Sequence, residues 1–329
     1  MGGMTSAGGS RWAVEVRGLG KRYRRRWAVR ECAFRLPAGT VCGLVGPNGS
    51  GKSTLLSMIA GLVPPTTGSV RLRGAPAGAP VDSAFLAQDK PLFPRFTVEE
   101  TLRLGEELNP RWDQAVAERI VRSGAIPLHA RVGALSGGQR SRVALALAFG
   151  KRPGLLLLDE PMADLDPLAA HELAGLLMAE AAEQGTTVLM SSHQLSDVAT
   201  MCDQLVVLGE GRVRLAGEID ALLASHRLVT GAHLVEGVPP GIARHTVVES
   251  RTVGRQFTAL IRPHGPVEGE WKVAEPTLEE VLLAHLRSPG TPPLLTVGAR
   301  VDAAPTEKAD AAHPENTENT ENAEEESAI

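Results

Sequence analysis

Short apolar runs alternate with longer stretches of helical periodicity from about Trp12 to Ala224. The apolar runs are bounded by glycine, proline or charged residues, as buried β-strands usually are. The alternation predicts an α/β fold with a mostly parallel sheet covered by helices, in a domain spanning about residues 11–225. The clearest strand candidates are Thr40–Val45, Leu155–Leu158, Thr186–Met190 and Leu205–Leu208.

A purely helical pattern interrupts this alternation between Thr97 and Ser123. Its apolar residues recur at the three- and four-residue spacing of one helix face. We therefore expect a helical subdomain at about residues 92–150, inserted in the larger domain. The apolar positions that carry the pattern include Val98, Leu102, Leu108, Val116 and Ile120.

The texture changes at residues 226–288, where short strand-like pieces such as Phe257–Ile261 and Trp271–Val273 are broken by glycine and proline. Thr277 is followed three residues later by Glu280, which is the capping-box pattern that opens a helix. We expect a small α+β accessory domain there, ending in a helix over Leu278–Leu286.

The final stretch, residues 289–329, is rich in proline, alanine and glutamate and contains a near-repeat of Glu-Asn-Thr triplets. Nine acidic residues oppose only Arg300 and Lys308. A segment of this composition cannot bury enough apolar surface to fold. The sequence therefore predicts a disordered acidic tail, although the net charge of the whole chain is only −4.

The cysteines Cys32, Cys42 and Cys202 lie far apart and have no partner at metal-ligand spacing. They are typical of reduced, buried thiols in a cytosolic protein. No apolar run approaches the roughly 18–20 residues that cross a bilayer, and Met1–Ser10 lacks the apolar core of a secretion signal. We expect a cytoplasmic protein that reaches a membrane only through partners.

A glycine-rich loop follows the strand candidate Thr40–Val45 and opens a helical run. Small residues allow successive backbone N–H groups to point at phosphate oxygens, and the helix N-terminus adds partial positive charge. Lys52 is expected to reach the β- and γ-phosphates of ATP, and Ser53 to ligate Mg²⁺. A plain glycine turn between a strand and a helix is the alternative. The loop consists of Gly46, Pro47, Asn48, Gly49, Ser50, Gly51, Lys52, Ser53 and Thr54.

Two carboxylates, Asp159 and Glu160, end the buried strand candidate Leu155–Leu158. Ligands collect at the carboxyl ends of strands in open α/β sheets. Asp159 is therefore expected in the Mg²⁺ shell, and Glu160 is placed to act as the general base that takes a proton from the attacking water. A solvated turn would explain the pair if it stood alone.

The segment Leu135–Gln139, LSGGQ, resembles the signature of the ATP-binding-cassette (ABC) family. It precedes a helical run, so that a second helix N-terminus can face an anion. The resemblance covers about Trp12 to Ala224 and implies that this N-terminus caps the ATP held by a second copy of the cassette, in a head-to-tail dimer. The residues that would make this contact are Ser136, Gly137, Gly138 and Gln139.

The same resemblance extends to four further positions. Gln88 looks like the glutamine that touches Mg²⁺ and the water, and His193 like the switch histidine that contacts the γ-phosphate and orders Glu160. Asp166 lies in a segment similar to the D-loop, although Ala163 stands where many members carry serine. Tyr23 lies where members stack an aromatic ring on adenine. A surface aromatic and an ordinary hydrogen-bonded histidine are the alternatives.

The family resemblance implies an ATP-hydrolysing subunit that drives a separate transmembrane permease. The segment Pro276–Leu283 is similar to one that ends many bacterial drug and antibiotic exporters, so we expect export of small molecules.

One alternative is a non-transport cassette ATPase that acts on nucleic acid or ribosomes, which the basic run at Lys21–Arg26 would suit. We expect no nucleic-acid partner and interpret the run as a solvated face near a triphosphate, because the folded part of the chain is barely basic overall. A regulatory partner without hydrolysis is the other alternative, and the intact Glu160 and His193 speak against it.

Overall fold

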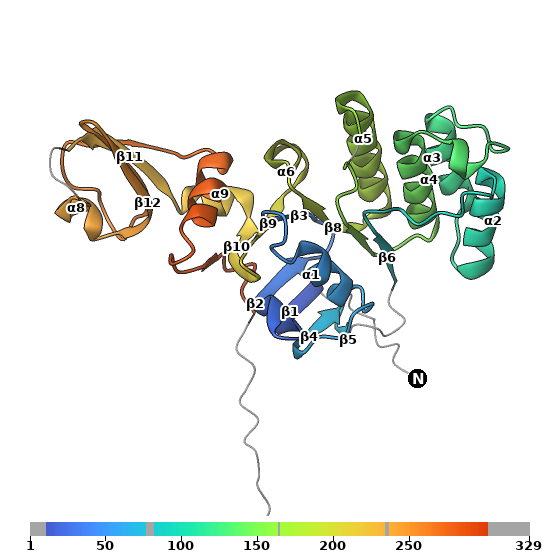
Figure 1. Ribbon diagram of the computed structural model, residues 1–329, viewed down its shortest axis with the longest axis horizontal. Coiled ribbons are helices and arrows are strands. Elements are labelled where there is room, and N and C mark those ends of the chain that lie inside the picture. The colour runs from blue at the N-terminus through green and yellow to red at the C-terminus, as the bar shows by residue number, and fades with distance from the viewer. Residues whose placement is uncertain (1–10, 77–81, 164, 234–236, 302–329) are drawn as a thin grey trace, which may run out of the picture.

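The computed structural model describes residues 11–76, 82–163, 165–233 and 237–301. The long axis of the molecule runs from a helical subdomain at one end, through a two-sheet body, to a small α+β unit at the other (Figure 1). Within the described ranges, no helix is long and apolar enough to cross a membrane.

The body is built on a seven-stranded sheet with the order β15-β10-β9-β3-β8-β7-β6. Five neighbouring strands, from β9 to the edge strand β6, are parallel, and the almost fully buried β3 and β8 and the fully apolar β7 lie between these two. Strands buried on both faces read as continuous apolar runs, which is why the sequence predicted them. The parallel strands are β3 (Val41–Val45), β6 (Ser83–Leu86), β7 (Leu155–Leu158), β8 (Thr187–Ser192) and β9 (Gln204–Gly209). β10 (Arg212–Glu218) is antiparallel to β9.

Four helices belong to this body: α1 (Lys52–Ile59), α5 (Pro167–Gln184), α6 (Leu195–Met201) and α7 (Ile219–Ala224). α1 follows β3 directly, and it packs its buried Leu55, Leu56 and Ile59 against the core that the two sheets share. The loop between β3 and α1 is thereby fixed at the carboxyl edge of the sheet.

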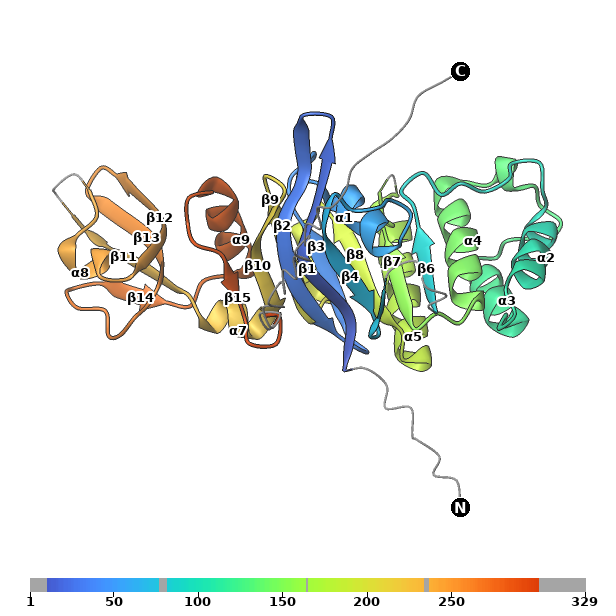
Figure 2. The ribbon, with the colours of Figure 1, turned by 90° about the horizontal axis from the view of Figure 1, so that it is seen from below.

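A second, four-stranded antiparallel sheet with the order β2-β1-β4-β5 covers one side of α1. Its two long strands, β1 (Trp12–Tyr23) and β2 (Arg26–Pro37), form a hairpin that projects beyond the rest of the fold (Figure 2). β4 (Thr67–Leu72) and β5 (Ala75–Pro76) complete it. The expectation of one mostly parallel sheet is wrong for this region, because β1 and β2 are joined by a two-residue turn, which only antiparallel strands can use.

The helical subdomain contains α2 (Val98–Leu108), α3 (Gln114–Ser123), the short 3₁₀ helix η1 (Val132–Ala134) and α4 (Gly137–Gly150). Thr97 and Glu100 form a complete capping box at the start of α2, and Asp113 caps α3. The apolar faces of these helices join one core with β7, β8 and α5.

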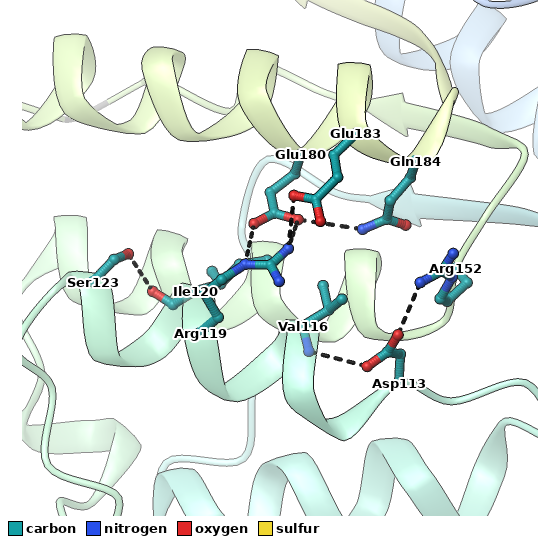
Figure 3. A network of polar contacts seen from close by, with 9 residues as sticks. All are labelled: Asp113, Val116, Arg119, Ile120, Ser123, Arg152, Glu180, Glu183 and Gln184. Atoms are coloured by element: carbon teal, nitrogen blue, oxygen red, sulfur yellow. Dashed lines mark hydrogen bonds and ion pairs between the residues drawn. The ribbon is translucent and has the colours of Figure 1, made fainter.

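Arg119 of α3 fixes the subdomain to α5 (Figure 3). Its guanidinium donates to both carboxylate oxygens of Glu180, at 3.1 and 2.8 Å, and to Glu183 at 3.1 Å. Glu180 is only 4% exposed, whereas the side chain of Arg119 is half exposed. These bonds raise the pKa of Arg119, chiefly through its hydrogen bond with Glu180.

The accessory unit is an antiparallel sheet with the order β12-β13-β11-β14, with the short α8 (Pro240–Ala243) beside β12. Helix α9 (Leu278–Arg287) begins with the expected capping box of Thr277 and Glu280. Val281 and Leu282 of α9 share one core with cassette residues such as Leu205 and Leu215. The accessory strands are β11 (Arg227–Ala232), β12 (Thr246–Val253), β13 (Gln256–Arg262) and β14 (Lys272–Ala274).

The prediction that the tail begins at residue 289 is wrong. β15 (Leu294–Leu295) pairs in parallel with β10, and Ala299 is 2% exposed. The backbone N–H of Arg35 donates to the carbonyl of Ala299 at 2.9 Å, so that this segment is tied to β2. Residues 289–301 carry apolar side chains, which distinguishes them from the acidic stretch that follows. Residues 302–329 lie outside the described residues.

Candidate functional site

The loops that carry four of the expected site segments leave the same edge of the seven-stranded sheet. β3, β8, β7 and β6 are consecutive neighbours and run in parallel, so that their carboxyl ends meet. The phosphate loop follows β3, His193 follows β8, Asp159 and Glu160 follow β7, and Gln88 follows β6. This sheet order brings residues far apart in the sequence to one place, as the rule for open α/β sheets predicts.

The phosphate loop needs its glycines because its backbone passes close to two other strands. A Cβ on Gly46 would lie 2.2 Å from the carbonyl oxygen of Leu208. Gly51 has φ +103°, and a Cβ there would lie 2.4 Å from the carbonyl oxygen of Ala28 in β2. Only glycine fits both positions without displacing backbone, so the loop is held in its curled form.

Lys52 is the first residue of α1 and lies folded back into the loop with only 6% exposure. Its Nζ donates to the carbonyl of Gly46 at 2.9 Å and to that of Pro47 at 3.5 Å. The hydroxyl of Ser50 is buried in the same loop and has no hydrogen-bond partner among the described residues. A buried ammonium, an unpartnered hydroxyl and a helix N-terminus together suit a bound phosphate. Ser53 and Thr54 lie in the first turn of α1.

Glu160 lies between Lys52 and His193. One carboxylate oxygen is 3.6 Å from the Nζ of Lys52, and the other is 3.2 Å from Nδ1 of His193. Glu160 also has a left-handed backbone with φ +46°, a conformation that non-glycine residues adopt mainly where surrounding structure enforces it. The structure therefore brings together three residues that the sequence assigned to the reaction.

Ser191 is the functional residue that the sequence analysis missed. Its Oγ donates to Oδ1 of Asp159 at 2.7 Å and accepts from the backbone N–H of Glu160 at 2.8 Å. It is fully buried in β8, the strand beside β7. Its only sequence signal is a hydroxyl two residues before His193, at the end of an apolar strand.

The residues present fit a magnesium ion. No cluster of three or more His, Cys, Asp or Glu that could hold a metal occurs in the part of the chain that the structure describes. Mg²⁺ is commonly held by one or two carboxylates together with substrate phosphates, not by an all-protein cage. Asp159 supplies such a carboxylate, oriented by Ser191, and Ser53 supplies a hydroxyl at the start of α1.

Gln88 points to the helical subdomain as well as to the sheet edge. It is exposed, and it lines a cavity of about 370 Å³ together with Gly137 and Arg140 of α4 and Ala163 and Leu165 of the segment after Glu160. No described hydrogen bond joins Gln88 to Asp159 or Glu160, so its contact with a metal stays a prediction.

The signature residues form the N-terminus of α4. Ser136 and Gln139 make a reciprocal capping box, in which Ser136 N–H donates to Gln139 Oε1 at 3.0 Å and Gln139 N–H donates to Ser136 Oγ at 3.3 Å. Gly137 and Gly138 form the first turn, and Ser136 is exposed. Among the described residues, no hydrogen bond or ion pair joins this helix end to the phosphate loop of the same chain.

Asp166 has a structural role within its own chain. Its carboxylate accepts from the backbone N–H groups of Leu168 and Ala169, at 3.1 and 3.0 Å, and so caps α5. Its assignment to a D-loop stays a prediction. Asp164 of the same segment lies outside the described residues.

Tyr23 is 49% exposed at the end of β1, beside the hairpin turn. The ammonium of Lys21 lies 5.4 Å from the centre of its ring. The hairpin reaches the phosphate loop through Ala28, whose carbonyl contacts Gly51. An exposed ring at this position is free to stack on a base, which keeps the adenine assignment as a prediction.

Residues 29–163 match a family model described as ABC transporter. The aliphatic sulfonates import ATP-binding protein SsuB of Escherichia coli (strain K12) is 38% identical over 207 residues, which are 61% of this chain and 79% of that protein. SsuB of Shigella flexneri is 37% identical over the same length and the same shares of both chains.

Solved structures agree with this match. The ATP binding subunit of an ABC transporter has a TM-score of 0.57 and 30% identity, covering 64% of this chain and 92% of that one. The cbiO1 protein from Clostridium perfringens, part of the ABC transporter complex cbiONQ, has a TM-score of 0.56 and 27% identity, covering 65% and 91%. The chain belongs to the ABC transporter family, and it is an ATP-binding subunit and an ATPase of the kind that is coupled to transport.

The expectation of export is contradicted by these relatives, since SsuB is named for import. The segment Pro276–Leu283, on which export was predicted, lies outside the matched residues 29–163 and forms the start of α9. Leu278 and Leu282 pack on the cassette core there. The apolar spacing of the segment is therefore explained by packing and carries no information on direction.

Proposed function

We propose that this chain binds ATP together with Mg²⁺ at the carboxyl edge of the seven-stranded sheet and hydrolyses it with Glu160 as general base. The observation that carries the proposal is the position of the Glu160 carboxylate between Lys52 Nζ at 3.6 Å and His193 Nδ1 at 3.2 Å. A carboxylate held beside a phosphate-binding lysine is placed to take a proton from water that attacks the γ-phosphate.

Each residue of the site has a distinct task in this scheme. The N–H groups of the phosphate loop and the ammonium of Lys52 bind and orient the phosphates. His193 holds the carboxylate of Glu160, and Ser191 fixes Asp159 and the Glu160 backbone in one position. Ser53 and Asp159 would hold Mg²⁺, which when bound neutralises charge on the phosphates.

A second copy of the chain completes the site in our proposal. The N-terminus of α4 has an exposed serine, and no anionic partner for it occurs among the residues that the structure describes, which supports its use on the ATP of another cassette. We infer a head-to-tail homodimer, with Ser136, Gly137, Gly138 and Gln139 on the phosphates of the opposite copy.

The partner that uses the energy is, in our proposal, a separate transmembrane permease. An apolar groove of about 420 Å³ lies between the end of β6 and α4, lined by residues that include Leu62, Phe85, Leu92 and Leu147. Phe93, beside this groove, is 58% exposed. An amphipathic helix of a permease suits such a groove. The groove adjoins the Gln88 loop, so a shift of that helix would reach the site.

This arrangement implies a cytoplasmic chain bound peripherally to the inner face of the membrane. The names of the relatives support inward transport, because the SsuB proteins of both organisms are named for import of aliphatic sulfonates. We therefore infer that the permease moves a small molecule into the cell.

The test is a pull-down from detergent-solubilised membranes with the Glu160→Gln variant and ATP. This variant is expected to bind ATP and to stall, which holds the complex together. Recovery of a multi-spanning permease, lost when Lys52→Ala is added as the control, supports the proposal. Recovery of ribosomes or nucleic acid alone would contradict it and favour a non-transport cassette. Uptake of the permease substrate into proteoliposomes then fixes the direction.

A further inference from the structure

The β1–β2 hairpin ends in a dense cluster of positive charge, which we call the basic tip: Lys21, Arg22, Arg24, Arg25 and Arg26. The hairpin projects from the body of the molecule, so that its end faces solvent (Figure 2). Among the residues that the structure describes, Arg24, Arg25 and Arg26 form no ion pair. The nearest acid in sequence, Glu31, is already paired with Arg30 and Arg212.

The turn at the end of this hairpin consists of two arginines, which are unusual residues for a two-residue turn. Tyr23 pairs with Arg26, which leaves Arg24 and Arg25 as a two-residue hairpin turn. Such turns favour asparagine or glycine, because they need positive φ angles. Arg24 has φ +53°, a left-handed conformation that is unfavourable for residues with a Cβ atom. Arginine therefore occupies a turn position where local propensity disfavours it.

The chain also contains an acidic segment whose negative charge can balance the charge of the basic tip. Residues 302–329 carry nine carboxylates against the single Lys308. The described part of the chain ends at Val301, two residues after Ala299, whose carbonyl accepts from the backbone N–H of Arg35 in β2. Arg35 and Arg26 lie about 30 Å apart along this strand at ~3.3 Å per residue. The chain from Val301 to Glu315 spans up to about 45 Å, so the glutamates from Glu315 onward can reach the tip.

We propose that the acidic segment 302–329 docks on the basic tip of the β1–β2 hairpin and competes there with ATP. The tip is two residues from Ala28, which contacts Gly51 of the phosphate loop, and it carries Tyr23, which we assign to the adenine. The competition with ATP rests on the proposed function, whereas the docking itself does not. The segment then acts as a tethered anion that raises the nucleotide concentration needed for activity.

Docking is tested in the full chain without nucleotide. The hairpin variant Arg25→Lys introduces an amine that a carbodiimide couples directly to carboxylates. The matched control is Arg255→Lys, in the two-residue turn of the β12–β13 hairpin at the far end of the molecule. Mass spectrometry is expected to find position 25 joined within one chain to glutamates of 315–326, and position 255 not joined. Equal coupling at both positions, or none at position 25, overturns the proposal. Attachment of the hairpin to anionic vesicles with no coupling to the tail would also overturn it.

Competition is tested by converting Glu315, Glu318, Glu321, Glu324, Glu325 and Glu326 to glutamine in the full chain. The Kd for ATP is expected to fall about fivefold at low salt, which is the lower end of usual coupling between sites. The difference is expected to vanish at about 0.5 M salt, where charges are screened within a few ångströms. An unchanged Kd at low salt, with the cross-link present, would retain the docking and refute the competition. Failure of ATP to bind at all would instead refute the proposed function.

Discussion

At the scale of single residues, Lys52 is the group on which we expect ATP binding to depend. Its ammonium is buried in the phosphate loop and donates to Gly46 and Pro47. We predict that Lys52→Ala weakens ATP binding by at least tenfold, because a charge-assisted bond to phosphate contributes roughly 1.5–3 kcal/mol. Titration with a fluorescent ATP analogue measures this. Affinity equal to the wild type would rule out the phosphate role.

Ser191 offers a sharper test, because its hydroxyl is bonded to the Asp159 carboxylate and to the backbone N–H of Glu160. Ser191→Ala removes the bonds to Asp159 and to the N–H of Glu160. We predict a fall in kcat of about 10–100-fold, as for other residues that orient metal ligands, with little change in the Kd for ATP. Ser191→Thr keeps the hydroxyl and is the matched control, expected to recover most of kcat. If kcat fell and Kd rose together in both variants, Ser191 would be a packing residue only.

The sequence predicted most of the site because its chemistry requires fixed residue types at fixed distances from strand ends. Lys52, Glu160 and His193 were assigned from motifs, and the structure brings them into contact. Ser191 could not be predicted in the same way, since a serine at a strand end has many uses. Its role appears only when the order of β7 and β8 in the sheet is known.

At the scale of elements, the ion pair between α3 and α5 sets how firmly the helical subdomain is held. Glu180 is 4% exposed, and each of its carboxylate oxygens accepts from Arg119, while Gln184 donates a longer bond of 3.4 Å (Figure 3). We predict that Arg119→Met lowers the free energy of unfolding by about 3–5 kcal/mol, because it leaves a buried carboxylate without its cationic partner. Urea unfolding measures the loss.

The same helix provides the control for that prediction. Glu183 also accepts from Arg119, but its side chain is 63% exposed. Glu183→Gln is expected to change stability by less than about 1 kcal/mol, as for other surface pairs. If both variants lost the same amount, burial of Glu180 would not explain the effect.

Elements were predicted well where burial is continuous and poorly where it is not. β7 has the predicted bounds Leu155–Leu158, and α9 begins at its predicted cap. β1, β2, β11 and β12 were not predicted, since each mixes polar and apolar residues irregularly. β15 was missed because its two leucines lie in a segment whose overall composition predicts disorder. Pairing with β10 stabilises a strand that local sequence does not.

At the scale of the whole molecule, α9 joins the accessory sheet to the cassette, and a buried histidine pair lies at this junction. His226 follows α7 of the cassette, and His285 lies on α9; their Nε2 atoms are 3.0 Å apart. Nδ1 of His226 is 2.7 Å from the carbonyl of Leu222. The two side chains are 0% and 2% exposed, and no ion pair of either with an acid occurs in the described part of the chain, so either imidazolium would be buried unpaired.

This burial makes the junction sensitive to acid. Burial, with smaller effects from His226, Arg262 and Arg214, lowers the pKa of His285 to about 3, and burial lowers the pKa of His226 as well. Between the ordinary histidine pKa of about 6.5 and the lowered one, only the unfolded chain binds the proton. The free energy of unfolding therefore falls as pH falls through this window. At pH 5 the loss from His285 is about 2 kcal/mol.

We predict that the urea midpoint of the wild type falls between pH 7.5 and pH 5 by more than that of His285→Gln. Glutamine retains hydrogen-bonding groups beside His226 but does not titrate, so the variant isolates the protonation of His285 from the loss of packing. Stability of the variant at pH 7.5 reports the packing change, and the difference between the two pH values reports the proton. Equal pH dependence in both proteins would show that the acid sensitivity arises elsewhere, and that the junction between cassette and accessory sheet holds at pH 5 as it does at neutrality.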